Sequence, residues 1–207
     1  MNQAKRKRLL LLVLALIGGM AAACAPKLQP EESCHFVQNG EKQRVSWKKN
    51  LPVEIYIHKS VPIEFRSSIY NAVTKWETRV GRRLFDIRGV NYSDSDAEKD
   101  GKSIIYWKDT WSDSRATEQA RTTIYWKLYQ ISEADMKINA KDFTFFTNEL
   151  PDGAIHLESL VIHELGHVLG LKHNEKGGSV MNSVLSNYTE RDEISDQEID
   201  ALKCEYF

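Results

Sequence analysis

The sequence predicts an α+β domain over residues 34–207. Three observations predict it. Several short segments alternate apolar and polar residues as half-buried strands do, one long segment repeats apolar residues at intervals of three and four, and a second, strongly apolar helix carries histidines. The chain of 207 residues is long enough for one well-buried domain and too short for two ordinary ones. Its composition, 42% apolar and 28% charged, is typical of a globular protein.

The first predicted strand lies in RVSWKKNLPVEIYIH (44–58), where Val53, Ile55 and Ile57 fall on one face. A long helix is predicted to begin after Pro62, since proline is favoured in the first turn of a helix. Its apolar residues recur at intervals of three and four until Gly81 stops the pattern: Phe65, Ile69, Ala72, Val73, Trp76 and Val80. We expect this stripe to pack on a sheet.

Further strands are predicted after the helix. They are LFDIRGV (84–90), KSIIYWK (102–108), RTTIYWKLY (121–129) and ADMKINA (134–140). The polar stretch NYSDSDAEKDG (91–101) between them is typical of an exposed loop. Asp94, Asp96 and Asp100 offer oxygen ligands for a structural calcium ion, but they lack the full loop pattern with a closing glutamate, so a solvated turn is favoured.

The segment before the domain is typical of exported proteins. Residues 5–8 are basic, residues 9–17 are apolar, and small residues precede Cys24, which together make a secretory signal peptide. A membrane-spanning helix is the alternative, because the uncharged stretch has 18 residues, near the lower limit for crossing a bilayer. Gly18 and Gly19 favour the signal peptide, since they interrupt the apolar run.

The segment AAAC (21–24) resembles the lipobox of bacterial lipoproteins, in which the cysteine is lipidated and becomes the first mature residue. The resemblance implies a signal peptide over 1–23, a lipid on Cys24 and a short tether over 24–33. It places the protein in a bacterial cell envelope, attached to a membrane by acyl chains. After removal of residues 1–23, the protein would have 24 basic and 29 acidic side chains, and so a net charge of about −5. This charge gives no reason to expect nucleic-acid binding.

Two cysteines remain if Cys24 carries lipid. Cys34 and Cys204 lie near the two ends of the predicted domain, in a compartment where disulfides persist. A bond between them would close a loop of about 170 residues and add about 2–4 kcal/mol of stability by the chain-entropy model. Two unpaired, buried thiols are the alternative.

Residues 163–173 read HELGHVLGLKH, with three histidines and one glutamate in eleven positions. The apolar residues around them predict a helix that starts near Leu157 and is buried on most sides, where histidine and glutamate need a partner. Side chains four residues apart lie on one helical face, so His163 and His167 can point at one spot. This spacing is typical of a zinc site.

The third histidine needs a break in the helix. A continuous helix would carry His173 about 15 Å along the axis from His163, too far to share a metal ion. The chain must therefore leave the helix after His167. Gly170 can adopt the left-handed conformation that ends helices, which lets the following residues turn back toward the metal. The spacing thus predicts two ligands from a helix and a third from the loop beyond.

Three neutral imidazoles leave the fourth tetrahedral position of zinc open for water, which indicates a catalytic site. Zinc lowers the pKa of that water and polarises a carbonyl group. Glu164, next to the first histidine, can take a proton from the water as a general base. We therefore expect hydrolysis of peptide bonds without a covalent intermediate. The alternative is a lipoprotein that uses its zinc site to bind a peptide or a partner without cutting it.

HELGHVLGLKH resembles the HExxHxxGxxH motif of the metzincin peptidases, and GGSVMN places Met181 where those enzymes have their Met-turn. The order of strand, long helix, further strands and zinc helix is similar to that of a bacterial matrixin-type peptidase. The ending ISDQEIDALKCEYF resembles the last helix of matrixin domains. In it, Ser195 and Glu198 form a capping box, and Ile194 and Ile199 a hydrophobic staple.

The resemblance implies a zincin-like metzincin fold: a mixed, twisted sheet with a long N-terminal helix, a zinc-binding active-site helix and a C-terminal helix. It implies a zinc endopeptidase that acts on proteins or peptides. It assigns the site residues as His163, His167 and His173 for one zinc ion, Glu164 for the general base, and Met181 for the apolar floor beneath the metal. A related metallopeptidase subfamily stays open, because Asn174 stands where matrixins usually have serine.

Other residues near the motif receive weaker roles. We expect His35, His58 and His156 to be packing or surface residues, and Tyr188 is a candidate for the wall of the substrate pocket. The absence of histidines from residues 91–155 argues against a second, structural zinc ion. We expect a monomer whose extended substrate adds as a strand to a sheet edge, the one made by RTTIYWKLY.

Overall fold

The predicted strands form a five-stranded sheet in the computed structural model, which describes residues 30–93, 99–148 and 153–207. Its strand order is β2-β1-β3-β5-β4. The bounds are β1 Val53–His58, β2 Phe85–Tyr92, β3 Ser103–Lys108, β4 Ala120–Lys127 and β5 Gln130–Asn139. Strands β2, β1, β3 and β5 run parallel, whereas β4 runs antiparallel to β5. The sheet is therefore mixed, and β4 forms an edge, as the sequence predicts.

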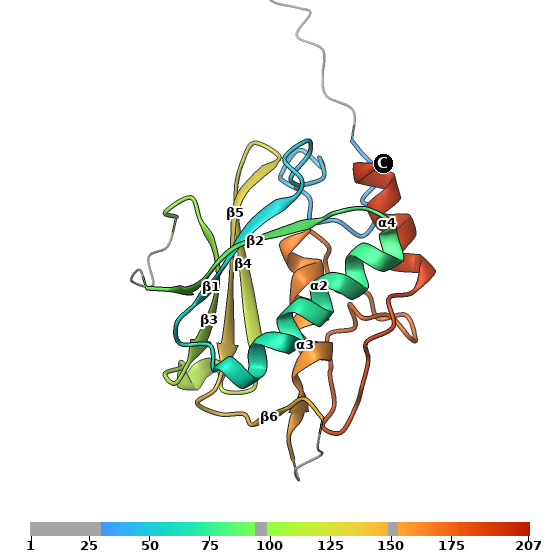
Figure 1. Cartoon of the computed structure of the whole chain (residues 1–207). Coiled ribbons are helices and arrows are strands. Elements are labelled where there is room, and N and C mark those ends of the chain that lie inside the picture. The colour runs from blue at the N-terminus through green and yellow to red at the C-terminus, as the bar shows by residue number, and fades with distance from the viewer. Residues whose placement is uncertain (1–29, 94–98, 149–152) are drawn as a thin grey trace, which may run out of the picture. The chain divides into compact units, whose positions relative to one another are not determined.

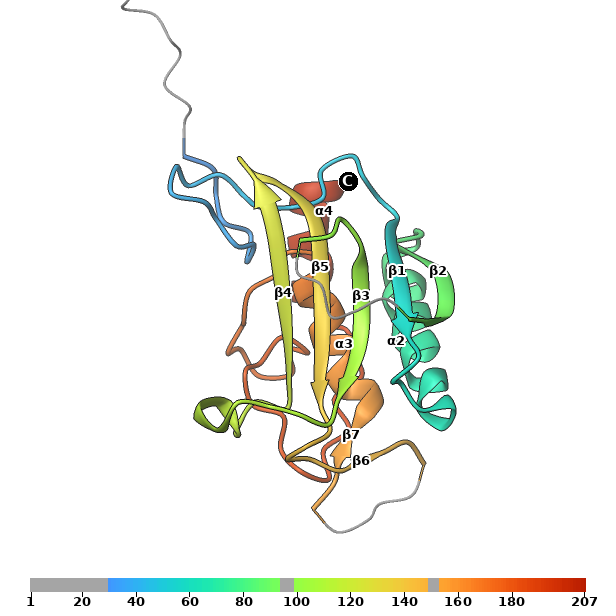
Figure 2. The same ribbon diagram turned by 90° about the vertical axis from the view of Figure 1, so that its left-hand side faces the viewer.

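The alternating pattern of β1 sets which face of the sheet enters the core. Val53, Ile55 and Ile57 are buried, whereas Glu54 is exposed and Tyr56 is half-buried. The helices cover one face of the sheet, which Figures 1 and 2 show from two directions. The apolar side chains of β1 belong to the same core as those of the helices.

The long helix α2, Arg66–Val80, lies on this face. A 3₁₀ turn over Ile63–Phe65 precedes it, and Pro62 begins that turn. Gly81 ends the helix in the left-handed conformation, with φ of 77°, as predicted. Trp76, fully buried, donates a hydrogen bond through Nε1 to the carbonyl oxygen of Ile162, at 3.0 Å. This bond ties α2 to the second core helix, α3 (Leu157–Val168).

The C-terminal helix α4, Asp196–Tyr206, begins with the predicted capping box of Ser195 and Glu198. Ile194 and Ile199 are both buried, in agreement with the predicted staple. Glu198 also accepts a hydrogen bond from the buried hydroxyl of Ser179. The helix start is thereby joined to the segment that leads to Met181.

Some features were not predicted. The strands β6 (Phe145–Phe146) and β7 (Ile155–His156) form a short parallel pair. The loop expected over 91–101 begins later, because β2 reaches Tyr92, which pairs with His58 of β1. Of its candidate calcium ligands Asp100 is exposed, and the other two, Asp94 and Asp96, lie outside the described residues.

The predicted disulfide between Cys34 and Cys204 is present, with the two Cα atoms 6.3 Å apart. The predicted signal peptide and Cys24 lie outside the described residues, as does the tether up to residue 29. None of the helices within the described ranges has the length and apolar character needed to cross a membrane.

Candidate metal centre and substrate cleft

The active-site helix α3 ends where the sequence predicts. Its last residue is Val168, and Gly170 takes the left-handed conformation with φ of 98°. The amide of Gly170 donates to the carbonyl oxygen of His167, at 2.9 Å, and that of Leu171 to the carbonyl oxygen of Gly166, at 3.0 Å. These bonds close the helix and reverse the chain, so His173 returns toward the helix instead of continuing along its axis.

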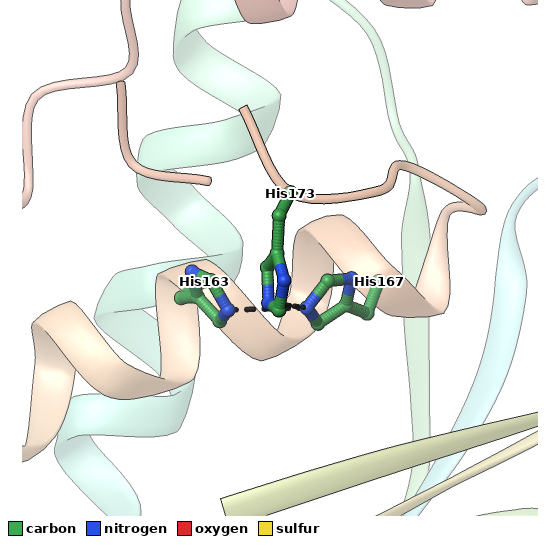
Figure 3. Close-up of side chains that lie close together, drawn as sticks. All are labelled: His163, His167 and His173. Carbon is green, nitrogen blue, oxygen red and sulfur yellow. Dashed lines mark hydrogen bonds between the residues drawn. The ribbon is translucent and has the colours of Figure 1, made fainter. Parts of the chain in front are cut away.

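Three imidazoles meet at this turn. The Nε2 atom of His167 lies 3.1 Å from Nε2 of His163 and 3.2 Å from Nε2 of His173 (Figure 3). Each ring offers one nitrogen atom as a ligand, and these three atoms all lie within 4.8 Å of one another. The helix and the turn therefore present three nitrogen donors to one point.

The other nitrogen of two of these rings is held by backbone. Nδ1 of His163 lies 2.8 Å from the carbonyl oxygen of Val180, and Nδ1 of His167 lies 2.8 Å from that of Leu171. A carbonyl oxygen only accepts hydrogen bonds, so each Nδ1 carries the proton and donates it. The lone pair of each ring then sits on Nε2, the atom that faces the common point.

The environment keeps these imidazoles neutral. Burial, together with the neighbouring His167, lowers the pKa of His163 to about 3. Burial also lowers the pKa of His167 and of His173. Neutral imidazole is the form that binds zinc, and three such donors, two of them with the Nε2 lone pair fixed by a backbone hydrogen bond at Nδ1, fit a zinc ion. The donor set therefore suits the metal that the motif implies.

Met181 packs beneath the helix at Gly166, between the first two histidines. A Cβ atom at residue 166 would lie 2.2 Å from Sδ of Met181, so only glycine leaves room for this contact. Met181 is buried, and its carbonyl oxygen accepts a hydrogen bond from the amide of Asn174, at 2.9 Å. Asn174 also donates through its side chain to Gln197 of α4. Asn174, which stands where matrixins usually have serine, thus joins His173, the Met181 segment and α4.

Glu164, next to His163 on α3, contacts the edge strand β4. Its carboxylate is buried and accepts a hydrogen bond from the hydroxyl of Thr122 on β4, at 2.6 Å. Burial raises the pKa of Glu164 to about 7, although the bond from Thr122 opposes that shift. Thr122 is a site residue that the sequence did not predict, since no motif surrounds it and its partner lies 42 residues away.

A cavity of about 410 Å³ opens over the three histidines and Glu164. Residues 117–122, at and before the start of β4, form one wall, and residues 182–185, directly after Met181, form another. Arg191 also lines the cavity and holds the second wall, because its guanidinium donates to the carbonyl oxygens of Asn182 and Val184. The cavity runs along the sheet edge, where an extended chain can lie.

The other predicted residues lie elsewhere. The ring of His156 packs against that of Phe146, with centroids 5.1 Å apart, and its Nδ1 lies 2.8 Å from the hydroxyl of Ser159, so it is a packing residue. Tyr188, a candidate for the wall of the substrate pocket, is not among the residues that line this cavity. Its hydroxyl accepts a hydrogen bond from the amide of Gly153, and residues 182–185 line the cavity in its place.

The mixed sheet, the active-site helix and the three imidazoles brought together by a helix-ending glycine define a metzincin-type peptidase domain. The family model of the matrixins matches residues 46–206, and the chain belongs to the matrixin family. The family supports zinc metallopeptidase activity. A search of curated proteins found no match.

Proposed function

We propose that the protein is a zinc endopeptidase in which His163, His167 and His173 hold the metal and Glu164 is the general base. The observation that carries the proposal is the meeting of three Nε2 atoms beside a buried carboxylate in one open cavity. When bound, zinc supplies a Lewis acid that polarises the scissile carbonyl and makes water a stronger nucleophile at neutral pH.

The side chains of the cleft have separate roles in this mechanism. The imidazoles hold the metal as neutral donors, and the Nδ1–H groups of His163 and His167 donate hydrogen bonds to backbone carbonyl oxygens. Glu164 accepts a proton from the attacking water and delivers it to the nitrogen of the leaving amine. Thr122 fixes the carboxylate of Glu164 in the direction of the cavity through its hydrogen bond. No covalent bond to the protein is needed.

The substrate lies in this proposal as an extended strand along the edge of β4. That strand pairs with β5 on its inner side and lines the cavity with its first residues. Backbone hydrogen bonds to a sheet edge bind many sequences, and the cavity wall formed by residues 182–185 selects among side chains.

Cleavage of an unstructured protein tests this function. The fragment 25–207 is expected to contain about one zinc ion per chain and to cut casein at internal bonds. Removal of zinc by a chelator should stop cleavage, and one equivalent of zinc should restore it. If the fragment binds zinc yet cuts nothing across a broad peptide library, the protein is a zinc-containing binding protein instead.

We further propose that the protein is held in the bacterial cell envelope by lipid on Cys24. The AAAC segment supports this, and so does the Cys34–Cys204 disulfide, because such bonds persist outside the reducing cytosol. Metabolic labelling with a fatty-acid analogue is expected to mark the wild type and to leave Cys24→Ser unlabelled. Equal labelling of both proteins would exclude Cys24 as the anchor.

A further inference from the structure

The turn that carries the third histidine is held from outside α3. We call residues 168–171 the ligand turn. Carbonyl oxygens at the end of a helix have no partner within it and need donors from elsewhere. Three consecutive carbonyl oxygens of the turn accept hydrogen bonds from the two ends of the domain: Val168 from Nε1 of Trp47 at 2.7 Å, Leu169 from the hydroxyl of Tyr206 at 2.6 Å, and Gly170 from the amide of Val37 at 2.9 Å.

These contacts bear on two of the imidazoles. The carbonyl oxygen of Leu171, at the end of the ligand turn, lies 2.8 Å from Nδ1 of His167. The amide of Lys172, directly before His173, donates to the carbonyl oxygen of His35, also at 2.8 Å. Movement of the ligand turn would therefore shift the ring of His167 and the backbone of His173 together.

The donors are themselves joined to one another. The amide of Trp47 donates to the hydroxyl of Tyr206, at 3.2 Å, so the two donors share a hydrogen bond. The ring of Phe36 packs edge-on against the ring of Tyr206, with centroids 5.5 Å apart. The disulfide joins Cys34, two residues before Phe36, to Cys204, two residues before Tyr206. The bond is thus placed where it keeps the N-terminal segment and α4 together around the turn.

A buried ion network adds to this junction. Glu205 of α4 has a side chain that is 2% exposed and contacts Arg44, Lys48 and Ser46 of the N-terminal segment. Burial alone would raise the pKa of Glu205, but the hydrogen bonds from Lys48, Ser46 and Arg44 outweigh it and hold the pKa below its usual value. The carboxylate is therefore charged at neutral pH, and the network is complete there.

We propose that the disulfide-joined ends of the domain form a clamp that positions the zinc ligands, with Trp47 and Tyr206 as its positioning residues. The proposal rests on the proposed zinc-binding role of the three histidines. Formation of the bond takes two electrons and two protons from the thiols of Cys34 and Cys204 and gives them to a disulfide donor, whose own bond becomes two thiols. The clamp makes tight zinc binding depend on this oxidation, so the site is completed only after export.

Zinc affinity of the full-length, oxidised protein tests the clamp, measured by competition with a chromophoric chelator. Tyr206→Phe removes one hydroxyl and keeps the ring, and Trp47→Phe removes one indole N–H. Each is expected to raise the zinc dissociation constant about 10-fold or more, as loss of a group that orients a ligand does. The double variant Cys34→Ala/Cys204→Ala is expected to raise it at least as much.

A matched control separates positioning from a general loss of stability. Ile57→Val, in the core strand β1 away from the turn, should lower the melting temperature while the zinc dissociation constant stays within about twofold of wild type. Wild-type affinity in Tyr206→Phe and in Cys34→Ala/Cys204→Ala would overturn the clamp, as would an equal loss in Ile57→Val. If the wild type itself binds no zinc, the proposed function fails and the clamp with it. If the wild type binds zinc and cuts casein but the clamp variants match it, only the clamp fails.

Discussion

Glu164→Ala is expected to retain about one zinc ion per chain and to lose nearly all proteolysis. In the proposed site the three imidazoles bind zinc through Nε2. Two of these rings are held by backbone carbonyl oxygens, whereas the carboxylate of Glu164 accepts a hydrogen bond from Thr122 and lines the cavity. Its removal therefore leaves the donor set complete and takes away the proton acceptor. General-base catalysis contributes about 10²–10⁴-fold, so kcat should fall by at least that factor. Metal analysis paired with casein cleavage measures both effects.

Two further variants test a metal ligand and the hydrogen bond to the base separately. His167→Ala should lose both zinc and proteolysis, because it removes a donor and the bond to Leu171. Thr122→Val keeps the base and removes only the hydroxyl that lies 2.6 Å from its carboxylate, so kcat should fall about tenfold. The zinc content of this variant should be unchanged, and Thr122→Ser, which restores a hydroxyl, should recover the wild-type kcat. Cleavage by Glu164→Ala at the wild-type rate would show that another group is the base.

The regular elements were predictable because their signals are local. Val53, Ile55 and Ile57 alternate within one strand, and the stripe that contains Trp76 repeats within one helix. Such periodicity is set by burial of one face, and any packing partner enforces it. The strands β6 and β7 have two residues each, too few for a period, and they form because the chain brings Phe145 and Ile155 together.

The site was predictable only where its spacing encodes geometry. The intervals between the histidines determine that the helix must end, and Gly170 marks where. Thr122 could not be predicted, since its partner is set by how the edge strand crosses α3. Trp47 and Tyr206 are 159 residues apart in the chain, so no local pattern links them. The count of cysteines predicts a bond between the ends of the domain but not its place beside the ligand turn.

Gly170 has a second constraint that the sequence does not reveal. Its left-handed φ of 98° already disfavours any other residue. A Cβ atom there would also lie 2.6 Å from the carbonyl oxygen of Val45 and 3.2 Å from the ring of Phe36. The first of these neighbours is backbone, which cannot rotate away as a flexible side chain does. Both costs act on the turn between His167 and His173.

Gly170→Ala is therefore expected to lower the free energy of unfolding by about 3 kcal/mol, which combines backbone strain with overpacking. Because the turn must move away from Val45, the zinc dissociation constant should rise more than tenfold in the fraction that folds. Denaturant titration of the metal-free protein and chelator competition measure the two effects separately.

Gly177→Ala is the matched control, since a Cβ atom at residue 177 would have no neighbour within 4 Å and the φ there is not left-handed. That variant should stay within about 0.5 kcal/mol of wild type. Equal stability and zinc affinity in the two variants would show that the ligand turn adjusts without cost, and that its clamped geometry is not what holds the metal.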